Sequence, residues 1–280
     1  CEEKMELEFV KYEVKENIAR ITMNRADKMN ALNHGVWDDL IAAFDQAEWD
    51  QDVRVIILCG DPDGKAFCAG WDLKSSYYIT GPPGQEKWTT ANALSTLRSI
   101  SERYLKIMNV PKPVIAQIHG YCLAAGCYLE MLCDIAIAAE DAKMGHPVGR
   151  GWVDSMPLWV SYLGQRKARE MLMTQKIIDG QEAERIGLVN QAVLSDKLHD
   201  TVWEMAKLLC DVSPDAIALQ KEALNTHAEI MGRGATFAYH RQLNGLGRVV
   251  YRIDEDLNLE KSREGTKAQE KKNGKTPTEL

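Results

Sequence analysis

Three short and almost wholly apolar runs, with helical patterns between them, most constrain the fold of this chain. They are VRVIILC (53–59), the centre of PKPVIAQIHG (111–120) and IAIAA (135–139). Such runs are typical of strands buried on both faces of a parallel sheet. A helical pattern over about 91–108 precedes the second run, and AAGCYLEMLCD (124–134) precedes the third. Repeated strand, helix, strand order predicts right-handed βαβ units and an α/β fold with a largely parallel sheet.

The segments on either side of these runs are predicted as a hairpin and as helices. Residues 10–14 and 18–23 alternate polar and apolar side chains around KEN, which indicates a hairpin. Apolar side chains from Leu32 to Ala47 recur at helical spacing and predict one buried helix face. After about residue 160 the pattern is helical throughout. The helices expected there are 165–174, 179–186, 196–210 and 215–231, the last capped by Ser213 with Pro214 at its first position.

Charge and cysteine content exclude several classes of protein. The formal charge of −7 argues against a nucleic-acid partner, although a local site for an anionic small molecule stays open. No apolar run reaches the roughly 18 residues of a membrane span, and the acidic start CEEKMELEF resembles no signal peptide. The seven cysteines lack zinc-type or CxxC spacing and predict reduced, buried thiols. We therefore expect a cytoplasmic protein, or one from an organelle whose targeting segment is absent.

Two loops combine small residues with the ends of predicted strands. FCAGWDL (67–73) and HGYCLAAG (119–126) each follow an apolar strand and lead towards a helix. Ligands of α/β sheets bind at such carboxyl ends, and N–H groups at a helix start point outward. Two such donors aimed at one oxygen would form an oxyanion hole. Tight turns without a ligand are the simpler interpretation of the spacing alone.

Four separated stretches resemble the enoyl-CoA hydratase/isomerase family, the crotonases, in the correct order. They are ITMNRADKMNALN, FCAGWDL, KPVIAQIHGYCLAAGCYLEMLCDIAIAAEDAKMG and DGQEAERIGLVNQAV. The resemblance covers roughly residues 8–270. It implies a crotonase (ClpP-like) spiral of ββα units over 1–200, a C-terminal helical trimerisation region over 201–262 and a polar tail over 263–280. It also implies a homotrimer or a dimer of trimers.

The resemblance also implies which residues bind the substrate. Trp71 and Ala125 match the positions whose N–H groups bind the thioester oxygen in the family. The substrate would be an acyl-CoA ester, with coenzyme A as part of the substrate and no metal or redox cofactor. Arg25 and Lys28 are candidate phosphate partners, since cations on a loop suit that role, and solvated surface charge is the alternative. The CoA-binding residues expected are Arg25, Lys28, Asn30, Ala31, Leu32, Ala69, Gly70, Asp72 and Leu73.

Both catalytic glutamates of the family's hydratases are replaced in this chain. The first position is Tyr128 and the second is Val148. Glu130 lies about 200° around the predicted helix from Tyr128 at about 100° per residue, so we expect it to pair across a subunit or domain contact instead. Tyr128 points the right way, but a phenol with a pKa near 10 is a hydrogen-bond donor before it is a base. A two-glutamate hydratase is therefore disfavoured.

Asp154 is the first candidate for the acid/base, with His146 or Tyr128 assisting it. Some crotonases with other activities place an aspartate about eight residues past the second glutamate position, and Asp154 is six past Val148. Its alternative role is the N-cap of the next helix. The expected chemistry passes through an enolate or a tetrahedral intermediate. Alternatives are a non-catalytic acyl-CoA-binding member, or a hydrolase or ring-opening enzyme for a cyclic or aromatic acyl-CoA; Trp71 and Trp152 suggest a bulky acyl group.

Overall fold

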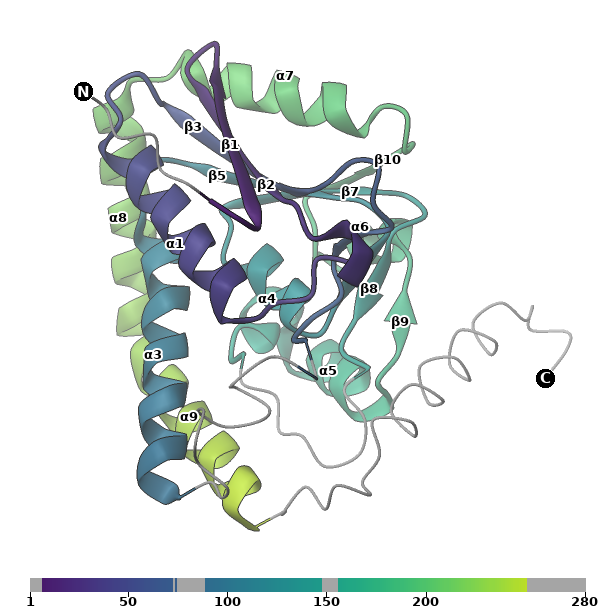
Figure 1. Cartoon of the computed structure of the whole chain (residues 1–280), viewed down its shortest axis with the longest axis vertical. Coiled ribbons are helices and arrows are strands. Elements are labelled where there is room, and N and C mark those ends of the chain that lie inside the picture. Colours follow the sequence, from purple (N-terminus) through teal and green to yellow (C-terminus); the bar gives the residue numbers. More distant parts are fainter. Residues whose placement is uncertain (1–6, 73, 75–88, 148–155, 251–280) are drawn as a thin grey trace, which may run out of the picture.

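A largely parallel sheet forms the centre of the protein (Figure 1). The computed structural model describes residues 7–72, 74, 89–147 and 156–250. The predicted hairpin pairs antiparallel at one edge, and the other strands run parallel. The predicted apolar runs form the buried strands at its centre. In spatial order the strands are β1 (Val10–Lys15), β2 (Ile18–Met23), β3 (Val55–Gly60), β5 (Val114–Ile118), β7 (Ile135–Ala139) and β10 (Gln191–Val193).

A second, smaller sheet is built from short strands that alternate with those of the main sheet. Each of β3, β5 and β7 is followed by one of these short strands, so the chain winds through both sheets in successive turns. This winding is the spiral of strand pairs that the resemblance implied. Strands two or three residues long carry too little periodicity to be predicted from sequence. In spatial order they are β4 (Ala66–Cys68), β6 (Tyr121–Leu123), β8 (Lys143–Gly145) and β9 (Ile177–Ile178).

Helices cover both faces of the main sheet (Figure 1). α7 (Leu198–Cys210) packs across β2, β3, β5 and β7, whereas α1 (His34–Trp49) packs on β1 and β2. The predicted helices are confirmed, except that α5 begins at Trp159, with a break at Gly164, whose φ is 68°. The separate helix α9 was not predicted. The remaining helices are α3 (Thr90–Asn109), α4 (Ala125–Met131), α5 (Trp159–Thr174), α6 (Gly180–Arg185), α8 (Pro214–Ile230) and α9 (Arg233–Val250).

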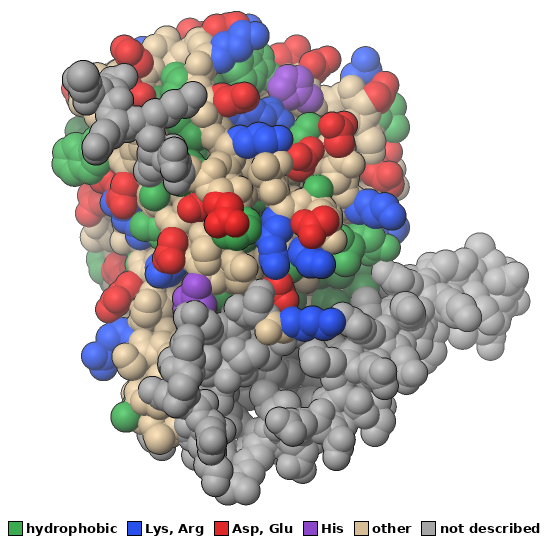
Figure 2. All heavy atoms as spheres, in the orientation of Figure 1, with side chains coloured by type: hydrophobic (Ala, Val, Ile, Leu, Met, Phe, Trp, Pro, Cys, Tyr) green, Lys and Arg blue, Asp and Glu red, His purple; other side chains and the backbone are tan. Residues whose placement is uncertain are grey.

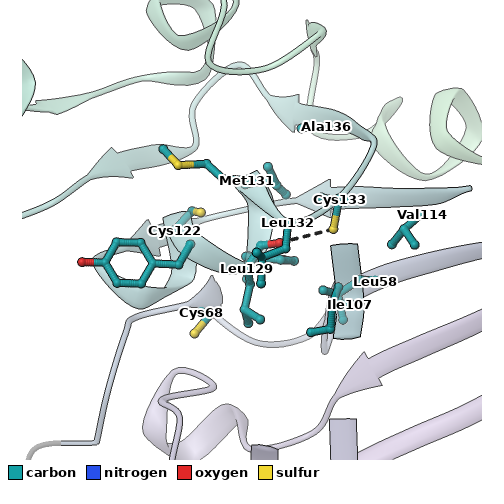
Figure 3. Packing of buried hydrophobic residues seen from close by; sticks show 14 of the residues in the cluster. Leu58, Cys68, Ile107, Val114, Cys122, Leu129, Met131, Leu132, Cys133 and Ala136 are labelled. Carbon is teal, nitrogen blue, oxygen red and sulfur yellow. Dashed lines mark hydrogen bonds between the residues drawn. The ribbon is translucent and has the colours of Figure 1, made fainter. Parts of the chain in front are cut away.

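The helix α4 lies in the hydrophobic core rather than on the surface, because every one of its residues is buried. Figure 3 shows its apolar side chains among residues of the neighbouring elements. Leu129 and Leu132 pack in one cluster with Ile107 of α3 and with Leu58 and Val114 of the main sheet. The cysteines that the structure describes are free thiols, and all but Cys210 are buried, as the sequence predicted. Because all its residues are buried, packing on every side of α4 holds the helix in place.

Among the described residues, no helix is both long enough and apolar enough to cross a membrane. Figure 2 shows acidic and basic side chains interspersed over the described part of one face. Within the same described ranges, no group of three or more His, Cys, Asp or Glu side chains is placed to hold a metal ion.

An ion pair with a buried lysine ties α8 to the main sheet. Lys221 Nζ lies 2.6 Å from Asp134 Oδ2 and donates to Lys112 C=O at 3.1 Å. The same carboxylate oxygen accepts from Val114 N–H at 2.8 Å. Lys221 is 9% exposed and Asp134 is 30% exposed at their side chains. Because α8 is otherwise largely exposed, this lysine is a main attachment of the helix to the β5 and β7 starts.

Replacing Lys221 by methionine is expected to lower the free energy of unfolding by about 2 kcal/mol. The change leaves Asp134 partly buried without its cation, and its 30% exposure reduces the penalty below the value for a fully buried pair. Urea denaturation measures the effect. The exposed neighbour Gln220→Met serves as the control and should change the midpoint little. An equal midpoint for the two variants would contradict the anchoring role.

Candidate active site

The loop after β4 is held by backbone hydrogen bonds to the segment before α1. Leu32 N–H donates to Gly70 C=O at 2.7 Å, and Asp72 N–H donates to Leu32 C=O at 2.8 Å. In a trans peptide the N–H of Trp71 points opposite to the C=O of Gly70, and no described peptide is cis. The Trp71 N–H is therefore directed away from Leu32. The backbone, and not the tryptophan side chain, sets this direction.

The second predicted donor lies at the first position of α4. Ala125 N–H has no acceptor inside the helix, as is general for a first helical residue. Ala124 C=O accepts from Tyr128 N–H at 3.3 Å, so the Ala125 N–H points the other way, out of the helix start. Ala124 enters the helix with φ 51° and ψ −116°, a conformation that is strained for a residue with a side chain.

Replacing Ala124 by glycine is expected to stabilise the protein by about 1 kcal/mol. Relief of a strained dihedral is worth about 1–3 kcal/mol, and the greater freedom of glycine in the unfolded chain offsets part of it. Thermal or urea unfolding measures the gain. The exposed helical residue Ala216 gives a control of opposite sign, because Ala216→Gly should lower stability by about 1 kcal/mol. A loss at both positions would argue against strain at Ala124.

The two loops lie directly against each other. An added methyl group on Gly126 would stand 2.1 Å from Cys68 O, so the start of α4 abuts the end of β4. An added methyl group on Gly70 would stand 3.5 Å from Ala125 N. The structure thus brings the predicted residues Trp71 and Ala125 to neighbouring positions, on backbones that glycine allows to approach closely.

Tyr128 and His146 form a buried pair beside these loops. Tyr128 Oη and His146 Nε2 are 2.5 Å apart, and the two rings stack with centroids separated by 5.4 Å. Tyr128 is 4% exposed and His146 is 6% exposed. Burial lowers the pKa of His146 to about 4, so the imidazole is neutral near pH 7. A neutral imidazole has one donor and one acceptor nitrogen, and such a pair can pass a proton.

A continuous row of aromatic rings connects the Trp71 side chain with this pair. Neighbouring ring centroids in the row are 5.4–6.2 Å apart. All members except Trp71 are buried. The sequence analysis missed the contribution of Trp37, Tyr104 and Trp159; helical spacing alone assigns the first two to the core. In order of contact the rings are Trp71, Trp37, Tyr104, Tyr128, His146 and Trp159.

The residues predicted to contact coenzyme A lie on two adjacent turns. Their side chains differ in burial and in the groups with which they pair. Asn30 and Leu32 are fully buried, so any contact they make with a ligand comes from the backbone. Lys28 is exposed and lies 3.7 Å from the Asp27 carboxylate. Arg25 instead lies 2.7 Å from Asp72, a pairing that the sequence did not indicate. The C=O of Ala31 accepts a hydrogen bond from the Arg25 guanidinium. The N–H of Ala69 donates to the C=O of Met29. Leu73 lies outside the described residues.

The remaining predicted positions have different outcomes. Asp154, Val148 and Trp152 lie outside the described residues. Glu130 is 2% exposed within this chain, so its side chain does not lie at the surface where a contact between subunits would form, and its expected pairing across a domain contact stays a prediction. Its Oε2 has no hydrogen-bond partner among the described residues, and burial holds its pKa well above the usual range. Glu130 is thus a core residue whose burial favours the protonated form.

Comparisons with known proteins agree on one relationship. A sequence model of the enoyl-CoA hydratase/isomerase family matches residues 13–249. A probable mitochondrial enoyl-CoA hydratase of Dictyostelium discoideum is 31% identical over 255 residues, covering 85% of this chain and 86% of that protein. A probable enoyl-CoA hydratase of Mycobacterium leprae (strain TN) is 34% identical over 219 residues, covering 76% and 80%. The crystal structure of a probable enoyl-CoA hydratase from Mycobacterium smegmatis matches with a TM-score of 0.78 at 34% identity, covering 86% and 94%.

The spiral of paired strands and the two abutting loops place this protein among the crotonases, an α/β fold class with C-terminal helices. Within that class, the chain belongs to the enoyl-CoA hydratase/isomerase family. It is therefore an enzyme of the hydratase/isomerase type that acts on acyl-CoA. The fold and family expected from the sequence are confirmed.

Proposed function

We propose that the N–H groups of Trp71 and Ala125 together bind the thioester oxygen of an acyl-CoA substrate. The observation that carries this proposal is the direct contact of the two loops, at Gly126 against Cys68 and at Gly70 against Ala125. Negative charge on the thioester oxygen is stabilised by both donors as an enolate or a tetrahedral intermediate forms. This chemistry requires no metal or redox cofactor.

Proton transfer is assigned to Tyr128 and His146, together with Asp154 as the predicted acid/base. When the α-proton leaves the substrate, Tyr128 Oη accepts it and passes its own proton to His146 Nε2. The result is an imidazolium and a neutral tyrosine, while the electron pair of the C–H bond becomes the enolate. The 2.5 Å separation of Oη and Nε2 supports this relay. Its reverse delivers a proton to the enolate.

Isomerisation, hydrolysis or ring opening fits this site better than hydration by two carboxylates. Tyr128 occupies the place of the first hydratase glutamate and is hydrogen-bonded to a histidine instead of to a water held by two acids. The partly exposed ring of Trp71, at the end of the row of aromatic rings, supports a cyclic or aromatic acyl group, since planar rings stack well on such a side chain.

Solvent deuterium uptake at the α-carbon of linear, branched, cyclic and aromatic acyl-CoA esters tests this function, with mass spectrometry as the readout. Enzyme-dependent uptake in at least one ester is expected. Asp154→Asn measured in parallel assigns the base: lost exchange places Asp154 in the step, and surviving exchange favours the Tyr128–His146 pair. Thioester cleavage without exchange supports the tetrahedral route. Tight ester binding with neither exchange nor product would favour a non-catalytic acyl-CoA-binding protein.

The chain is proposed to assemble as a homotrimer or a dimer of trimers, as members of its family do. Support comes from the exposed apolar side chains of α8 and its C-terminal end, namely Leu219, Leu224, Ile230 and Met231. Several exposed large apolar side chains on one helix of a soluble protein favour an interface. Sedimentation equilibrium gives the mass that decides between the two assemblies.

A further inference from the structure

Arg25 makes two contacts that cross-link the segments on either side of the loop after β4. Its Nη2 lies 2.7 Å from Asp72 Oδ2, and its Nη1 donates to Ala31 C=O at 2.9 Å. The side chains of Arg25 and Asp72 are 14% and 12% exposed, so this ion pair is largely shielded from water. A charge-assisted hydrogen bond in such a setting is stronger than one on the surface.

The turn that carries Arg25 is itself anchored. Asn30 is fully buried in a left-handed conformation, with φ 52°. Its Oδ1 accepts from Arg25 N–H at 2.9 Å, and its Nδ2 donates to Ala66 C=O at 2.8 Å. The turn is thereby fixed to β4, the strand that leads into the donor loop. Arg25 therefore reaches Asp72 from a rigid base.

The two contacts of Arg25 flank the backbone bridge that orients the Trp71 N–H. Ala31 precedes Leu32, and Asp72 follows Trp71, so the guanidinium joins the neighbours of both bridged residues. Among the described residues, three backbone hydrogen bonds join the two segments: Ala69 N–H to Met29 C=O, Leu32 N–H to Gly70 C=O and Asp72 N–H to Leu32 C=O. The Asp72 bond lies on the far side of Trp71, so a side-chain restraint on Asp72 helps to hold the peptide that carries the donor.

We propose that the Arg25–Asp72 ion pair is a clamp that positions the Trp71 N–H towards the substrate oxygen. This inference rests on the proposed oxyanion hole. A preorganised donor must keep its direction within about 10–20° to stabilise a developing charge. Arg25 is then a positioning residue, which acts on catalysis through the backbone, and its main contact is Asp72 and not a phosphate group of coenzyme A.

Comparing an acyl-CoA ester with the same acyl group on pantetheine separates the two roles of Arg25. The pantetheine ester has no phosphate groups. The clamp predicts that Arg25→Met and the isosteric Asp72→Asn lower kcat by about 10- to 100-fold on both esters, as a small misplacement does. The variants should leave the ratio of the two KM values unchanged. A raised KM for the CoA ester alone, at constant kcat, would overturn the clamp in favour of phosphate binding.

Isotope-edited infrared spectroscopy of a bound ester with ¹³C at the thioester carbon reports the donor directly. Binding to the wild-type protein is expected to lower the carbonyl stretching frequency. Arg25→Met and Asp72→Asn should each lose part of that shift, and Arg25→Lys should retain more of it than Arg25→Met. Arg185→Met, which breaks an exposed Arg–Glu182 pair of the same kind, is the matched control and should retain the shift. A full shift in both clamp variants would overturn the clamp alone. No shift in wild type would overturn the proposed oxyanion hole and the clamp together.

Discussion

Tyr128→Phe is expected to lower kcat by at least about 100-fold on the acyl-CoA ester that the exchange panel identifies, with KM little changed. The substitution keeps the ring in its stack with His146 and removes only the hydroxyl 2.5 Å from Nε2. General acid–base catalysis contributes about 10²- to 10⁴-fold, and the relay loses its first acceptor without that oxygen. Steady-state kinetics and α-proton exchange measure the loss.

The dependence of activity on pH is a second test of the Tyr128–His146 pair. Burial holds the pKa of His146 at about 4 in the folded protein, below the usual 6.5. The neutral imidazole that the relay requires is thus present throughout the neutral range, and activity should decline only as pH falls towards about 4. The same shift makes folding less favourable as pH drops below 6.5, because the unfolded chain takes up the proton first. A loss of activity that already sets in near pH 6.5 on acidification would contradict the burial of His146 that lowers its pKa.

Tyr162→Phe is the control for the tyrosine prediction. Tyr162 Oη donates to Met131 C=O at 2.9 Å, so this variant also removes a hydrogen-bonded hydroxyl. It should cost about 1 kcal/mol of stability and leave kcat unchanged. Similar losses of kcat in both variants would show that any missing hydroxyl disturbs the core, and the assignment of Tyr128 to proton transfer would fall.

Gly126→Ala is expected to abolish most activity, by more than about 100-fold, and to destabilise the protein by about 3 kcal/mol. Its methyl group would stand 2.1 Å from Cys68 O and 3.0 Å from the carbonyl carbon, both backbone atoms that cannot rotate aside. The start of α4 must then move away from β4, which separates the two N–H donors. Urea denaturation and the exchange assay measure the two effects.

Gly245 gives the control for this steric prediction. Within the part of the chain that the structure describes, an added methyl group there meets Leu97 and Leu94 at 3.5 and 3.6 Å, which is ordinary contact, and the residue lies inside α9. Gly245→Ala should therefore raise stability by up to about 1 kcal/mol through helix propensity. A Gly126→Ala protein with normal stability and normal exchange would show that the two loops tolerate separation.

The main sheet and most helices could be predicted because their residues carry strong periodic signals. β7 coincides with the run 135–139, and the buried face of α1 includes Val36, Leu40 and Phe44 as predicted. The second sheet could not be predicted from pattern, since β9 is two residues long and its strands are placed by the turns before them. Only the family resemblance implied the spiral.

The candidate site likewise contains residues that local sequence motifs predict and residues that they do not. The positions of Trp71 and Ala125 follow from local motifs, whereas the Arg25–Asp72 pair joins residues 47 positions apart and depends on how two turns meet. Glu130 was expected to pair across a subunit or domain contact because it lies about 200° around the helix from Tyr128. The structure buries it in the core, where desolvation raises the pKa of its carboxyl, and no local pattern reports that burial.

Both candidate donors are main-chain groups, and this has a consequence for engineering. A library that varies the side chains at 71 and 125 keeps the two N–H groups, provided that Gly70 and Gly126 are left intact. The reaction can then be changed by randomising Tyr128 and His146 alone. The two N–H groups that polarise the carbonyl stay the same in every variant. New reactions on acyl thioesters should be reachable from this chain with few substitutions.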